Sequence, residues 1–150
     1  MVPSQALIDQ IAALLATDAD TLAPATNANK VRLVVTPFTP APGLDIASLT
    51  FANFDGGAPI AGETGDQPIH IDPATGEWII TMKEPLGGWA WKVTGVTNLP
   101  QTVYGYALTD SAGMTLLGSA VLPTPVGLTA VAQGLDLGEV SFRVNAEPLS

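Results

Sequence analysis

Residues 76–122 decide the fold, and they read GEWIITMKEPLGGWAWKVTGVTNLPQTVYGYALTDSAGMTLLGSAVL. This stretch contains all three tryptophans, both tyrosines and two of the three methionines. Apolar and polar residues alternate along it, so that Trp89 and Trp91 fall on one side of an extended chain and Lys92 on the other. Because side chains on a strand point alternately to its two faces, the pattern predicts strands with one buried and one solvated face. Turns rich in glycine and asparagine separate the runs, which predicts a meander of four antiparallel strands.

The same alternation extends on both sides of this stretch and predicts about nine strands in all. They cover residues 31–36, 45–54, 67–72, 77–83, 89–96, 101–109, 114–122, 126–132 and 139–144. Proline-rich segments at 37–43 and 123–125 are expected to interrupt the sheets, since proline has no amide hydrogen to donate, and a turn is expected at 134–138. Short strands with frequent turns are typical of an all-β fold, here an antiparallel β-sandwich of jelly-roll or immunoglobulin-like type.

One amphipathic helix is predicted near the N-terminus, over residues 4–16, with Ser4 as its cap. Its apolar side consists of five residues spaced three and four apart: Leu7, Ile8, Ile11, Leu14 and Leu15. An extended linker over 21–30 follows, so the chain divides into an N-terminal helix and linker (1–30) and a single β-sandwich domain (31–150). The apolar side of the helix either packs on that domain or binds a partner, and both alternatives stay open.

The charge of the chain limits its partners. Fourteen acidic residues against five basic ones give a formal net charge of −9. A field of this sign repels phosphate backbones and anionic lipids, so we expect no direct binding of nucleic acid and none of membranes. The N-terminus lacks the basic and apolar regions of a secretory signal, and no run reaches the roughly 18 apolar residues of a membrane span. We therefore expect synthesis in a cytoplasm.

Residues suited to catalysis or metal binding are scarce. The chain has no cysteine and one histidine, His70, within the predicted strand 67–72. Any triad would depend on His70 as its base, and a zinc site would need three carboxylates besides it. No phosphate-binding glycine loop is present. We expect no enzymatic activity, no metal and no cofactor, and we interpret His70 as an outward-facing strand residue.

The aromatic residues of the central stretch allow two interpretations. Exposed on one face, Trp89, Trp91, Tyr104 and Tyr106 would form a platform on which sugar rings stack, as in a glycan- or receptor-binding β-sandwich module. Packed between sheets, the two tryptophans would instead fill the core. The core interpretation is favoured, since the chain has only four phenylalanines to supply volume.

Two segments also carry a resemblance to a known class of proteins: QTVYGYALTD at 101–110 and GMTLLG at 113–118. They are similar to a module of small virion proteins of tailed bacteriophages, and the resemblance covers roughly residues 89–144. It implies a β-sandwich that decorates a capsid or tail, with no catalytic residues. The implied partners are major capsid or tail subunits and other copies of the chain. The residues Gly118, Ser119 and Ala120 depart from the family, which places an aromatic and a charged residue here.

Overall fold

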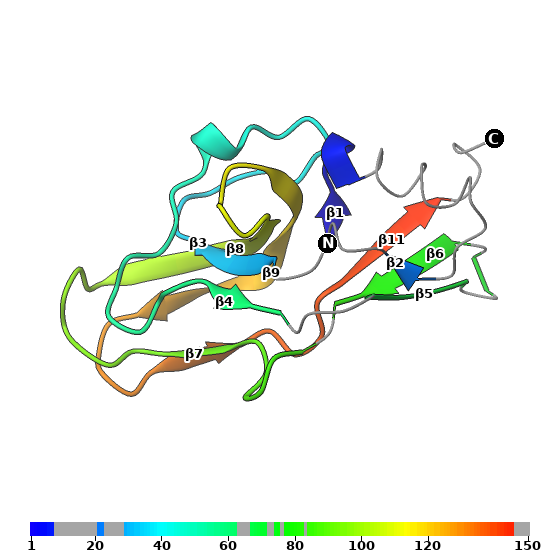
Figure 1. The fold of residues 1–150 in the computed structure, drawn as a ribbon. Helices are drawn as coiled ribbons and strands as arrows, with labels where there is room; N and C mark the ends of the chain where they lie inside the picture. The colour runs from blue at the N-terminus through cyan, green and yellow to red at the C-terminus, as the bar shows by residue number, and fades with distance from the viewer. Residues whose placement is uncertain are drawn as a thin grey trace.

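The computed structural model describes residues 1–7, 21–22, 29–62, 67–71, 74–75, 77–82 and 84–145 (Figure 1). These residues contain eleven strands rather than about nine, together with a helical turn at 5–7 and the short 3₁₀ helix η2 (Ile46–Ser48). Every strand pair is antiparallel, which confirms the all-β class. Within these ranges no helix has the length and apolarity needed to cross a bilayer.

The largest sheet has five strands in the order β1-β9-β8-β3-β4. Their bounds are Val2–Pro3 for β1, Leu116–Leu128 for β9, Gln101–Thr109 for β8, Lys30–Val34 for β3 and Ile60–Ala61 for β4. β8 and β9 form a hairpin, and β3 pairs with the other side of β8. The strand predicted over 101–109 is confirmed with the same bounds.

Two smaller sheets complete the fold. One has the order β11-β6-β5-β2, with bounds Ser141–Asn145 for β11, Glu77–Thr81 for β6, Gln67–Ile71 for β5 and Thr21–Leu22 for β2. The other pairs β10 (Gly134–Asp136) with β7 (Ala90–Lys92). The hairpin predicted from 67–72 and 77–83 is confirmed by the pairing of Ile71 with Trp78. The predicted four-stranded meander is wrong, because its strands lie in three different sheets. Alternation shows which face of a strand is buried but does not choose the strand's partner.

The proline-bearing segment of β9 does not break the strand as predicted. Residues 122–125, which include Pro123 and Pro125, lie opposite Tyr104 alone, between the pairs Gly105↔Val121 and Val103↔Val126. Such a bulge accepts residues that cannot donate ladder hydrogen bonds. β1 pairs with β9 only at positions 118 and 119, so this part of β9 is also a sheet edge, where proline is tolerated.

Two further strand assignments are corrected. The predicted strand 45–54 begins instead with η2, because the Asp45 carboxylate accepts a hydrogen bond from the Ala47 amide at 3.0 Å and caps the helical turn. Only Phe51 forms a bridge, to Val34. The predicted turn 134–138 contains β10, and the left-handed turn residue is Gly138, with φ 68°.

The described parts of the first thirty residues belong to the sheets. β1 extends the main sheet, and the Ser4 amide donates to the Leu117 carbonyl at 2.9 Å. The Ser4 hydroxyl accepts from the Leu7 amide at 3.3 Å, as a helix cap does. β2 lies within the predicted linker and pairs with β5.

Both faces of the main sheet are covered by apolar residues. The larger core lies on one side and joins Val31, Leu33, Leu108 and Leu117 to Trp89, Trp91, Met82 and Val140. On the other side the segment 37–51 passes over the sheet (Figure 1), and a second cluster forms from Val34, Leu49, Ala107 and Leu116 with Phe38, Leu44, Ile46 and Phe51 packed against it.

Gly105 is the point where this covering segment comes closest to β8. A Cβ added to Gly105 would meet the Ala120 carbonyl and would lie 2.8 Å from the Phe38 ring. We therefore expect Gly105→Ala to lower the free energy of unfolding by about 1–3 kcal/mol through overpacking, measured by urea denaturation. Gly127→Ala, on the paired strand and with open space around its Cβ, is the control and should leave stability unchanged. Equal stability of the two variants would contradict this account of the packing.

Candidate functional site

The predicted aromatic platform is corrected by the burial of its tryptophans. Trp89 is 0% exposed and Trp91 is 4% exposed, so neither ring can stack on a sugar at the surface. The Trp91 indole donates to the Ala58 carbonyl at 2.8 Å, whereas the buried Trp89 indole nitrogen has no hydrogen-bond partner among the described residues. Tyr106 is partly buried, and desolvation raises the pKa of its hydroxyl. The core interpretation of the two tryptophans is confirmed.

The predicted partner-binding side of the N-terminal helix is described only at its first residue. Leu7 is 0% exposed and packs in the larger core, so it is not available to a partner. The other four residues of that side, Ile8, Ile11, Leu14 and Leu15, lie outside the described residues. His70 lies in β5, paired with Ile79. No group of three or more His, Asp or Glu residues suited to a metal ion occurs in the part of the chain that the structure describes.

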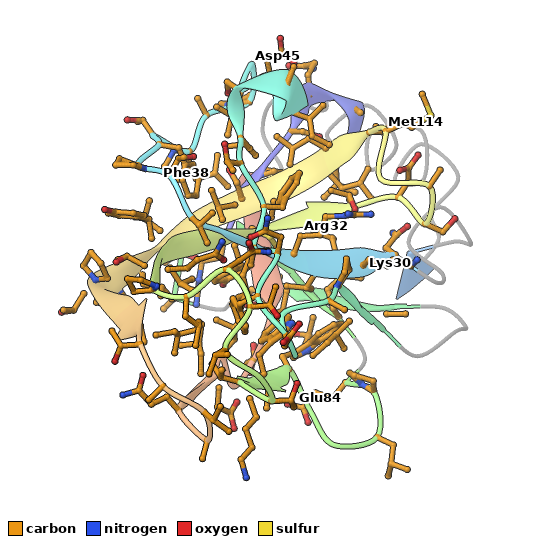
Figure 2. The ribbon with its side chains drawn as sticks, turned by 90° about the vertical axis from the view of Figure 1, so that its left-hand side faces the viewer. Lys30, Arg32, Phe38, Asp45, Glu84 and Met114 are labelled. Atoms are coloured by element: carbon orange, nitrogen blue, oxygen red, sulfur yellow. The ribbon has the colours of Figure 1, made fainter. Side chains whose placement is uncertain are left out.

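Three loops that are distant in sequence meet at one end of the molecule, the end that Figure 2 faces. We call this surface the loop face; it consists of residues 53–57, 93–101 and 129–133. Backbone hydrogen bonds join the loops: the Thr94 amide donates to the Asp55 carbonyl at 2.9 Å, and the Val93 amide donates to the Gln133 carbonyl at 2.8 Å.

Side-chain amides hold the loop face further. The Asn98 side-chain amide donates to the Asn53 carbonyl at 3.0 Å. The Gln101 side-chain nitrogen donates to the Asn53 side-chain oxygen. The Gln101 side-chain oxygen, Oε1, accepts from the Asn53 backbone amide at 3.3 Å. Within the third loop, Gln133 accepts from the Thr129 amide at 2.7 Å. Loops fixed in this way lose little conformational entropy on binding.

Two glycines allow the first two loops to approach each other. A Cβ on Gly56, which has φ 92°, would overlap the Lys92 carbonyl, and a Cβ on Gly95 would overlap the Asp55 carboxylate. Because neither glycine carries a side chain, the first loop can approach the Lys92 backbone, and the Asp55 side chain can lie against Gly95.

The loop face presents apolar side chains to solvent with little charge around them. Val96 is 76% exposed and Val131 is 49% exposed. Asp55 is the one ionisable residue in the three loops. Apolar side chains among amides and hydroxyls, with few charges, are typical of the central part of a protein–protein interface. Leu86 and Met114 are also exposed, at other turns.

An open groove of about 300 Å³ lies elsewhere, between the N-terminal segment and the β8–β9 hairpin. It is lined by residues 4–6, 42–46 and 114–116. The Gln5 amide donates to the Pro42 carbonyl at 3.0 Å, which joins two of the lining segments.

The turn between β8 and β9 is organised by the Asp110 carboxylate. Its Oδ1 accepts from the Met114 amide at 2.8 Å and from the Thr115 amide at 3.2 Å. Desolvation acts to raise the pKa of Asp110, but hydrogen bonds from the Met114, Thr115 and Gly113 amides outweigh it and lower that pKa below its ordinary value of 3.8.

Comparison of this chain with protein-family models, with curated proteins and with solved structures found no match. The similarity of residues 101–118 to phage virion modules therefore stays a prediction from sequence. The loop face was not identified from sequence either, since its residues fall in three separate turns. The available signal was the clustering of Asn98, Pro100 and Gln101 at the start of β8.

Asn98 makes the rigidity of the loop face testable. It has φ 59°, a left-handed conformation that asparagine and glycine tolerate better than alanine. We expect Asn98→Ala to lower the free energy of unfolding by about 1–2 kcal/mol, because it loses both the backbone tolerance and the hydrogen bond to Asn53. Asn98→Gly should lower the free energy of unfolding by about half as much, since glycine tolerates the left-handed conformation and only the hydrogen bond to Asn53 is lost. Urea denaturation measures both against the exposed control Thr97→Ala, and equal losses in the two Asn98 variants would contradict the proposed cause.

Asp110 should make stability depend on pH in acid. The pKa of Asp110 is lower in the folded chain than in the unfolded chain. The ionised carboxylate therefore stabilises the fold above the unfolded value of 3.8, and this stabilisation is lost as the pH falls through the lower folded pKa. We expect Asp110→Asn to be less stable than the wild type at pH 7 and to approach it at pH 2. Urea midpoints at several pH values give the comparison, with the exposed Glu139→Gln as a control. A stability difference that does not change with pH would overturn this assignment.

Proposed function

We propose that this protein is a non-enzymatic structural subunit that associates with copies of itself and with other proteins of a larger assembly through the loop face. The observation that carries the proposal is the exposure of Val96 and Val131 on loops that backbone and side-chain hydrogen bonds hold in place. Apolar side chains on fixed loops bind partners without a large ordering cost.

The charge distribution supports a protein partner. A net charge of −9 opposes the approach of copies of this chain to one another, but the loop face contributes only Asp55 to that charge. Copies that meet through this surface therefore avoid most of the repulsion between them. The same charge disfavours nucleic acid and anionic membranes as partners.

The proposed setting is a virion, where the chain would act as a capsid decoration or tail accessory subunit. The support is the similarity of segments 101–110 and 113–118 to modules of tailed-bacteriophage proteins. The proposed arrangement is a β-sandwich, supported by the shared core between the main sheet and the β7–β10 pair.

Self-association through the loop face is tested by light scattering from about 10 µM to about 1 mM, the range in which weak contacts saturate. We expect the mass to rise above that of the 15.4 kDa chain as the concentration increases. The double variant Val96→Asp, Val131→Asp should stay monomeric over this range, since it places charges in the contact.

The matched control is Leu86→Asp with Met114→Asp, which adds the same charge at two exposed apolar positions outside the loop face. The control should associate like the wild type. A wild-type chain that is monomeric throughout, or a control that dissociates equally, would contradict association through this surface.

A further inference from the structure

The start of β3 places two of the five basic residues of the chain side by side. Lys30 and Arg32 occupy alternate positions of the strand, so they share one face at a spacing of about 7 Å. Val31, between them, is 0% exposed and packs in the larger core on the opposite face. The acidic chain therefore has a local concentration of positive charge at this corner. Neither side chain forms an ion pair with any acidic residue in the part of the chain that the structure describes.

Arg32 is held in one orientation by its surroundings. Its Nε donates to the Thr109 hydroxyl at 3.1 Å, and Thr109 is itself 0% exposed. The guanidinium carbon lies 5.5 Å from the centroid of the Phe51 ring, within range of a cation–π interaction. Figure 2 shows Arg32 above Lys30 on the side of the β8–β9 turn.

Gly113 provides the space for the outer end of the Arg32 side chain. A Cβ on Gly113 would overlap the Nη2 nitrogen of Arg32. A side chain at position 113 would therefore force the end of the Arg32 side chain to shift from its present position.

The two Nη nitrogens of Arg32 are left without an acceptor among the described residues. The acidic residue of the same corner, Asp110, directs Oδ1 at the Met114 and Thr115 amides and forms no ion pair with Arg32. A half-buried guanidinium with its fork open matches a planar oxyanion, which can accept two parallel hydrogen bonds.

We infer that Arg32, with Lys30 beside it, forms a binding site for an oxyanion, and that the ligand is a carboxylate. The Nη1 and Nη2 groups donate the two hydrogen bonds, and the Lys30 ammonium adds a second positive charge. A carboxylate is favoured over a phosphate because the carboxylate group is planar and can lie in the plane of the guanidinium fork, whereas phosphate is tetrahedral. The site lies apart from the loop face and does not depend on the proposed function.

The experiment titrates the ¹⁵N-labelled full chain with glutarate and, separately, with inorganic phosphate at constant ionic strength. The Nε–Hε resonance of Arg32 is followed by NMR. We expect a saturable shift with a dissociation constant of about 10 mM or tighter for glutarate, and weaker binding of phosphate. Arg32→Gln and Lys30→Gln should each weaken binding, the former by about tenfold or more, as read from the amides of residues 110–114. The variant Lys92→Gln makes the same change of net charge at an exposed site and should bind like the wild type.

A second pair of variants tests position rather than charge. Gly113→Ala places a methyl group where Nη2 lies, so it should weaken glutarate binding by about tenfold while leaving the charge unchanged. Gly88→Ala is its control, because Gly88 has the same φ of 74° but open space around its Cβ. Binding in the control should equal that of the wild type.

A shift that does not saturate, or equal affinity of the wild type and Arg32→Gln for glutarate, would contradict the proposed binding site. Arg32 would then only pack over the Phe51 ring. Equal affinities of Gly113→Ala and Gly88→Ala would overturn the role of the guanidinium fork. Tighter binding of phosphate than of glutarate would overturn the carboxylate assignment.

Discussion

Burial of β8 on both faces is the constraint on which the rest of the structure depends. Val103 and Leu108 belong to the larger core, whereas Ala107 belongs to the cluster under segment 37–51. The strand can lie between two apolar layers only if its residues on the second face are small, and Gly105 and Ala107 meet that condition. The Phe38 ring, η2 and the bridge at Phe51 can then approach the sheet closely. The covering segment in turn supplies the ring against which Arg32 is placed.

The period-two pattern of the sequence predicted the strand class and several strand bounds, because alternation is a local property of an extended chain. Trp89 and Trp91 are buried as predicted, and Lys92 on the other side of the strand is exposed. Pairing was not predictable in this way, since β7 joins β10 across some forty residues and β6 joins β11. The strand predicted over 101–109, which contains YGYA at 104–107, was expected to have one solvated face. In the fold, its small residues instead mark the face that another segment covers.

The candidate sites were harder to predict because each combines residues from distant segments. The loop face depends on hydrogen bonds between positions 53 and 98 and between positions 93 and 133, and no sequence spacing signals these. The surroundings of Arg32 need Phe51, Thr109 and Gly113 at once. The aromatic residues suggested a binding platform in the sequence, but Trp89 and Trp91 fill the core. The residues that face solvent are valines and amides, which have no distinctive signature.

The prolines of β9 have a consequence for the kind of assembly open to this chain. An unprotected edge strand would allow successive copies to add by backbone pairing, and such growth has no natural end. Pro123 and Pro125 remove two amide donors from β9, the longest strand among the described residues, in the part of β9 with which β1 does not pair. The proposed association of copies would then depend on side-chain contacts, whose geometry can close a ring or occupy a fixed position on a lattice. The same two residues that interrupt a ladder thus favour a finite particle over a fibre.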